Sequence, residues 1–116
     1  MATLRRLVRQ NEEIVAPGLL FVECASVLAA GVRRTRWTGA AADAAYGLLM
    51  QLPVRTVSDR RHLERAWELA RRYDNHPVYD MLYVATAEAA GTVFITADDV
   101  LLKRLSHLGW VRGPSI

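Results

Sequence analysis

Residues 77–99, PVYDMLYVATAEAAGTVFITADD, decide the fold. The stretch predicts a helix with Pro77 in its first turn, a stop at Gly91, and a short apolar strand over 92–96. A further helix is expected to follow over 97–108. A buried strand placed between two helices is typical of an α/β domain, so we expect this class for the chain.

The same alternation of strands and helices runs through the rest of the sequence. We expect three further short strands, at 13–16, 54–57 and 109–111, and further helices at 2–10, 19–34, 39–52 and 59–73, while the helix that begins the stretch above spans 75–90. Strands that alternate with helices predict a parallel sheet covered by helices on both faces.

Two helix starts and one buried face follow from local patterns. Thr38 and Ser58 are the expected N-caps of the helices that they precede. In the helix over 59–73, apolar side chains recur at i, i+3, i+4 and i+7, which predicts a buried face made of Leu63, Ala66, Trp67 and Ala70.

Composition favours one domain over residues 1–116, because 52% of the residues are apolar and no linker interrupts them. We expect a cytoplasmic protein without a membrane partner, since the sequence has neither a spanning segment nor a signal peptide. The single cysteine, Cys24, agrees with a reducing compartment. Fourteen arginines stand against one lysine, Lys103. Arginine suits phosphate recognition, although codon bias in a GC-rich genome is the simpler explanation.

Acidic residues lie where two of the predicted helices begin. Asp98 follows the strand over 92–96, at the edge where ligands bind in parallel sheets. Asp80 lies in a first helical turn, where the helix dipole favours a carboxylate. The two could converge on one cation. The alternative is local: Thr96 and Asp99 form a capping box, and Asp80 merely complements its helix.

Glu23 is the only charge in LLFVECASVLAA, residues 19–30. On a helix buried nearly all round, a lone carboxylate would be costly unless an arginine or a metal ion paired with it.

Other candidate chemistries are weaker. His62, His76 and His107 lack a spacing that places two of them on one helical face, which argues against zinc. Cys24 has no neighbouring histidine and is expected to be a small core residue. The tryptophans are dispersed, as in a core or rim and not in a base-stacking platform.

From Ile14 to Trp110 the chain resembles a PIN domain, most of all the VapC type of toxin ribonuclease. Three segments carry the resemblance: VAPGLLFVECASVLAAGVRR with its glutamate, ARRYDNHPVYDMLYVATAEAAG with its Tyr-Asp pair, and VFITADDVLLKRL with its Thr-x-Asp. The resemblance implies a three-layer fold with a parallel sheet flanked by helices. It also implies an endoribonuclease that works as a toxin, forms homodimers and is neutralised by a VapB-like antitoxin.

Carried over to this sequence, the resemblance implies that Glu23, Asp80 and Asp98 bind Mg²⁺ or Mn²⁺, with Asp99 as a neighbouring ligand. The bound ion would activate water for hydrolysis of an RNA phosphodiester. A separate expectation concerns the arginines after the Glu23 helix: Arg33, Arg34 and Arg36 guide RNA phosphates, or else form a solvated face.

The sequence departs from the family at its start. Members begin with a strand and an Asp about thirty residues ahead of the first helix, and here nothing precedes MATLRRL. Glu12 and Glu13 cannot substitute for this Asp, because they come before the second strand of the family pattern and not at the carboxyl end of the first. We expect an incomplete N-terminus, with the first strand and first Asp missing. The alternatives are an inactive, naturally truncated relative that binds an antitoxin or an active paralogue, and a strand donated by a partner chain. An unrelated phosphatase or receiver-like domain is disfavoured, because no early strand ends in Asp.

Overall fold

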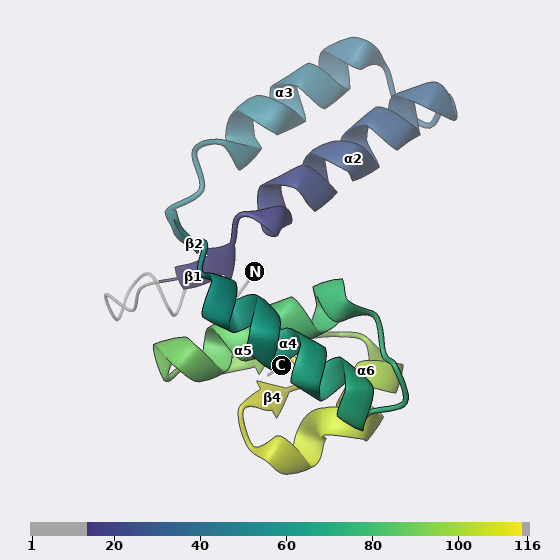
Figure 1. Ribbon diagram of the computed structural model, residues 1–116. Helices are drawn as coiled ribbons and strands as arrows, with labels where there is room; N and C mark the ends of the chain where they lie inside the picture. The colour runs from purple at the N-terminus through teal and green to yellow at the C-terminus, as the bar shows by residue number, and fades with distance from the viewer. Residues whose placement is uncertain (1–13, 115–116) are drawn as a thin grey trace.

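The structure is a computed structural model that describes residues 14–114, so the helix predicted over 2–10 lies outside the described residues. Five α-helices and short parallel strands confirm the predicted α/β class for this part of the chain (Figure 1). The elements are β1 (Ile14–Pro17), α2 (Leu19–Arg33), α3 (Gly39–Leu49), β2 (Val54–Val57), α4 (Arg60–Arg72), α5 (Val78–Ala90), β3 (Phe94–Ile95), α6 (Asp99–Leu105), the 3₁₀ turn η1 (Ser106–Leu108) and β4 (Val111–Arg112).

Most helix ends follow the local signals. Thr38 caps α3, since its side chain accepts a hydrogen bond from the backbone N–H of Ala41. Gly91 ends α5 in the left-handed conformation, with φ of 67°, which costs a glycine little. The prediction for α4 was one residue off: Asp59, not Ser58, is the N-cap and accepts from the N–H of Arg61.

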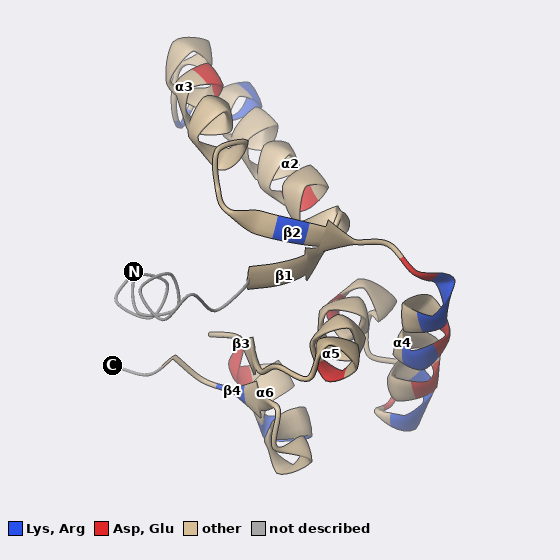
Figure 2. Cartoon of the chain, turned by 90° about the vertical axis from the view of Figure 1, so that its left-hand side faces the viewer, with Lys and Arg blue, Asp and Glu red and all other residues tan. Residues whose placement is uncertain are grey.

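The sheet is divided into two parallel pairs. β1 pairs with β2 and β3 pairs with β4, so the single parallel sheet that the sequence predicts is wrong for the described residues. Figure 2 shows the two pairs apart, both beside α5. β3 has only two residues, and Ile95 is 37% exposed, so the buried strand predicted over 92–96 is shorter and more open than expected. A strand with a partner on one side only has fewer ladder hydrogen bonds to hold it.

The core lies between α4, α5, α6 and β4. Its largest fully buried side chains are Leu69, Met81, Val84, Leu105 and Val111. The buried face predicted for α4 is right for Ala66 and Ala70 and wrong for Leu63 and Trp67, which are 52% and 59% exposed. The reason is that α4 packs on α5 through Ala66, Leu69 and Ala70, a line that turns the other two side chains outward.

Helices α2 and α3 form a hairpin that projects from the rest of the described chain, here called the body, which holds α4, α5, α6 and β4 (Figure 1). Gly31 is the one buried residue of the two helices, and Val22 and Val27 are more than 60% exposed. The expectation that α2 is buried nearly all round is therefore wrong. In the turn that connects α2 to α3, the indole N–H of Trp37 donates a hydrogen bond to the backbone carbonyl of Leu28. No described helix combines the length and apolar character needed to span a bilayer.

Candidate functional site

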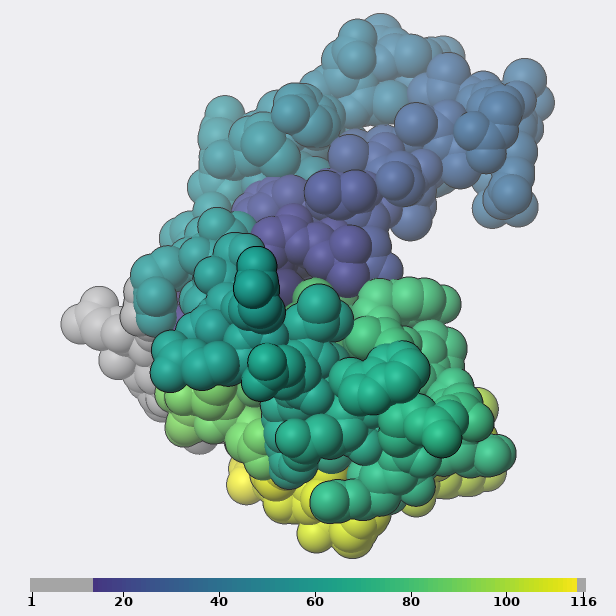
Figure 3. All heavy atoms as spheres, in the orientation of Figure 1, coloured from purple at the N-terminus to yellow at the C-terminus, as the bar shows by residue number. Residues whose placement is uncertain are grey.

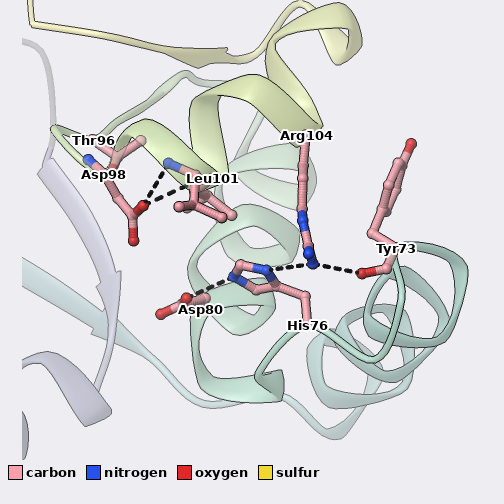
Figure 4. Close-up of polar contacts among 8 residues, drawn as sticks. Tyr73, His76, Asp80, Thr96, Asp98, Leu101 and Arg104 are labelled. Carbon is pink, nitrogen blue, oxygen red and sulfur yellow. Dashed lines mark hydrogen bonds and ion pairs between the residues drawn. The ribbon is translucent and has the colours of Figure 1, made fainter.

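The acids Asp80 and Asp98 lie at the starts of neighbouring helices. Asp80 is in the first turn of α5, and Asp98 is the N-cap of α6. Figure 4 shows the two carboxylates pointing to the same side of these helices. Acidic side chains are common at such positions, because the N–H groups of the first helical turn can donate hydrogen bonds to them.

A buried histidine holds Asp80. Nε2 of His76 lies 2.7 Å from Oδ2 of Asp80, and His76 is 7% exposed. On the other side of the ring, Nη1 of Arg104 lies 3.2 Å from Nδ1. Sequence reasoning missed His76 because it asked only whether two histidines share a helical face. The signal was the nearness of the two residues in sequence: His76 lies just before α5 and Asp80 lies in its first turn, so the two side chains can meet at the helix start.

Asp98 has a structural task of its own. Its Oδ1 accepts hydrogen bonds from the backbone N–H groups of Val100 and Leu101, at 3.0 and 3.1 Å. The N–H of Asp98 donates to Oγ1 of Thr96. The predicted capping box of Thr96 and Asp99 is thus wrong, because Asp98 is the residue that caps the helix. Capping uses Oδ1, which leaves Oδ2 as the oxygen that can meet a ligand.

Glu23 pairs with a tyrosine. Oε1 of Glu23 accepts a short hydrogen bond from the hydroxyl of Tyr83, so the partner is neither of the two that the sequence suggested. Tyr83 lies three residues after Asp80 on α5, almost one turn away on the same side of the helix. Burial, and then the bond to Glu23, raise the pKa of Tyr83 well above its ordinary value of 10. Tyr83 therefore remains protonated and donates to Glu23.

The carboxylates suit a hard divalent cation in their chemistry, but the described residues contain no group of three or more His, Cys, Asp or Glu side chains that could hold one. Asp80 keeps Oδ1 and Asp98 keeps Oδ2 for a ligand, while Glu23 is engaged by Tyr83. Asp99 is exposed in the first turn of α6. The residues present thus fit part of a ligand set.

The three arginines predicted to meet RNA lie at the tip of the α2–α3 hairpin. Arg33 ends α2, and Arg34 and Arg36 follow it; all three are exposed. Arg33 comes ten residues after Glu23, which corresponds to about 15 Å along a helix. Glu23 and these arginines therefore lie toward opposite ends of α2, and Figure 2 shows the acidic and basic positions of this helix apart.

A hollow of about 810 Å³ separates the two strand pairs. It is lined on one side by β1 and on the other by β3 and β4, through residues that include Ile14, Val15, Val93, Ile95, Trp110 and Arg112. The N–H groups of Phe94 and Thr96 donate to carbonyls of the β4 segment, at 2.7 and 3.0 Å. Because backbone groups alternate along a strand, those of Val93 and Ile95 face the hollow. An extended segment placed here would find donors and acceptors.

A family model described as PIN domain matches residues 1–108 of the chain. Neither the curated proteins nor the solved structures contain a match to the chain.

Proposed function

Because this chain belongs to the PIN domain family, whose members are generally metal-dependent nucleases, we propose that it is a VapC-type endoribonuclease, the toxin of a toxin–antitoxin pair. The observation that carries the proposal is a carboxylate at the start of each of two helices, Asp80 in the first turn of α5 and Asp98 at the N-cap of α6. We further propose that residues 1–116 form one domain, that it works in the cytoplasm, and that RNA is the substrate.

In this proposal Asp80 and Asp98 bind Mg²⁺ or Mn²⁺ through the oxygens that their protein partners leave unused. The ion supplies Lewis-acid chemistry that activates water and neutralises charge on the phosphate. Glu23, held by the hydroxyl of Tyr83, is the third acid, and Asp99 is a neighbour.

The test is cleavage of a labelled RNA pool by the purified chain with Mg²⁺ or Mn²⁺. Asp80→Asn should lower the rate at least about 100-fold, as expected for loss of a positioned catalytic group, and EDTA should abolish it. Asp43→Asn is the matched control, because Asp43 is an exposed carboxylate on α3 and should leave the rate unchanged. Equal rates for the Asp80 variant and the wild type would reject the proposal.

We propose that Arg33, Arg34 and Arg36 bind RNA phosphates at the hairpin tip. Replacing all three with glutamine should weaken RNA binding and reduce the slope of log K against log[salt] by about 0.7 for each phosphate of single-stranded RNA that the arginines neutralise. Filter binding at several salt concentrations measures the slope. An unchanged slope would mean that these arginines do not bind RNA phosphates and form an ordinary solvated surface.

The hollow between β1 and β3 favours a second candidate, an inactive PIN-like binding module that pairs with an antitoxin or with an active paralogue. A partner's extended segment would suit this hollow, because the edge of β3 that faces away from β4 offers backbone groups to it. If the purified protein is folded but does not cleave RNA, this result supports the binding module. Cleavage that begins only after an upstream strand ending in Asp is joined to residue 1 would support the nuclease.

The exposed apolar side chains of α2 and α3 support the two protein partners in the proposal, an antitoxin and a second copy of the chain. Val22, Val27 and Leu48 are each more than 60% exposed. Apolar surface of this kind on neighbouring helices is typical of a protein interface.

A further inference from the structure

A line of three side chains joins α6 to the acid of α5 (Figure 4). Arg104, in the last turn of α6, donates from Nη1 to Nδ1 of His76 at 3.2 Å and to the carbonyl of Tyr73 at 3.0 Å. His76 meets Oδ2 of Asp80 at 2.7 Å with its other nitrogen. The exposed carboxylate of Asp74 lies 4.0 Å from Arg104 at the outer end.

The chemistry of Arg104 decides where the proton of His76 resides. A guanidinium has donors and no acceptor, so Nδ1 of His76 must accept the hydrogen bond. The ring proton of the neutral imidazole then lies on Nε2 and is donated to Asp80. Arg104 therefore selects the one tautomer in which His76 can hold the carboxylate.

The same contacts exclude His76 as a general base. Both ring nitrogens are engaged, and the side chain is 7% exposed, so neither nitrogen can take a proton from a substrate or from water. Because His76 cannot exchange protons with a reactant but donates a hydrogen bond to Asp80, its role is to hold that carboxylate in place.

We propose that His76, set in its tautomer by Arg104, is a positioning residue that binds Oδ2 of Asp80 and presents Oδ1 to the cation. This inference rests on the proposed function. Outer partners of this kind orient metal-binding side chains in many sites. Because Arg104 lies on the helix that Asp98 caps, the line also ties the two acids to each other, from α5 through His76 to α6.

The first measurement is the tautomer of His76 in the wild-type chain, by long-range ¹H–¹⁵N correlation NMR without metal. We expect the signal of a protonated Nε2 and an unprotonated Nδ1. In Arg104→Met the preference for this tautomer should weaken, because the variant has no donor to Nδ1. A protonated Nδ1 in the wild type would overturn the proposal whether or not the chain binds metal.

The second measurement is Mn²⁺ affinity by electron paramagnetic resonance, in variants whose folding is checked by circular dichroism. His76→Leu should weaken binding about 10- to 100-fold. His76→Gln keeps an N–H donor and should recover most of the affinity. His107→Leu is the matched control, because His107 meets the Tyr73 hydroxyl at 2.9 Å and should leave the affinity unchanged.

The outcomes separate the two proposals. If a folded His76→Leu variant binds Mn²⁺ as tightly as the wild type, the positioning role of His76 is overturned, but the proposed nuclease activity is not affected. A wild-type chain that neither binds Mn²⁺ nor cleaves RNA overturns the nuclease activity proposed for residues 1–116 and the link to the metal, and it supports the binding module. If His76→Leu does not fold, the tautomer spectrum and His76→Gln decide: weak binding by the glutamine variant overturns the role as stated.

Discussion

Helices α2 and α5 are both rich in apolar residues, yet they differ sharply in burial. The thirteen residues of α5 bury five of their number, Met81, Val84, Ala85, Thr86 and Ala87. The fifteen residues of α2 bury only Gly31. α5 packs against α4 on one side and lies beside strands on the other, whereas α2 contacts chiefly α3 and the end of β1. Apolar composition thus predicts that a helix needs a covering, and the neighbours decide whether it has one.

The exposed hairpin is the part of the molecule with the most apolar surface left to cover. Figure 3 shows α2 and α3 standing clear of the body that holds the core. A pocket between the two helices is lined by small side chains such as Ala25, Ala29 and Ala42 and by the larger Leu28, Val32 and Tyr46. Val22, Val27 and Leu48 remain exposed. The body folds around a shared core, whereas the hairpin leaves apolar surface exposed to solvent.

The largest expected effect contrasts one leucine from each region. Leu69→Ala removes a fully buried side chain of α4 and should lower the free energy of unfolding by about 2–5 kcal/mol. Leu48→Ala in α3, where the leucine is 66% exposed, should change it by less than about 0.5 kcal/mol. Urea unfolding followed by circular dichroism compares them. Equal losses would break the contrast and show that another chain covers the hairpin in solution.

A second substitution tests what holds the hairpin together. In Gly31→Ala the added Cβ would lie 2.0 Å from the ring of Trp37, which must then leave its place and its bond to Leu28. The expected cost is about 1–3 kcal/mol, seen as faster hydrogen exchange in α2 and α3 with little change in α5.

The control for this test is Gly47→Ala, because nothing lies within 4 Å of the Cβ that it adds to α3. It should stabilise the hairpin by up to about 1 kcal/mol through helix propensity. Faster exchange in both variants would mean that the Trp37 contact is not what holds the two helices.

The smallest effect concerns acid stability at the start of α4. Hydrogen bonds from the side chain and backbone of Arg61 lower the pKa of Asp59 to about 2. The folded chain therefore prefers the ionised form, and this contribution is present above the ordinary pKa of 3.8 and is lost as the pH falls toward 2.

Thermal unfolding of the wild type and Asp59→Asn at several pH values measures the contribution. The wild type should be slightly more stable above pH 4, and the difference should vanish near pH 2. A difference that stays constant over this range would show that the ion pair with Arg61 adds nothing to the cap.

The position of the acids was predictable, and their partners were not. Sequence reasoning found Asp80 and Asp98 at helix starts, because strand ends and helix starts can be read from local patterns. It could not find that Tyr83 binds Glu23, since sixty residues separate the two. It overlooked His76, whose tie to Arg104 exists only once α6 packs beside α5.

Sequence alone determined the order of strands and helices, the cap at Thr38, the stop at Gly91 and the parallel pairing of short strands. These features depend on side chains and backbone groups a few residues apart. Tertiary structure alone decided that the sheet is interrupted, that α2 is exposed and that α5 is buried. Burial and strand neighbours depend on which distant segments meet, and no periodicity within one segment carries that information.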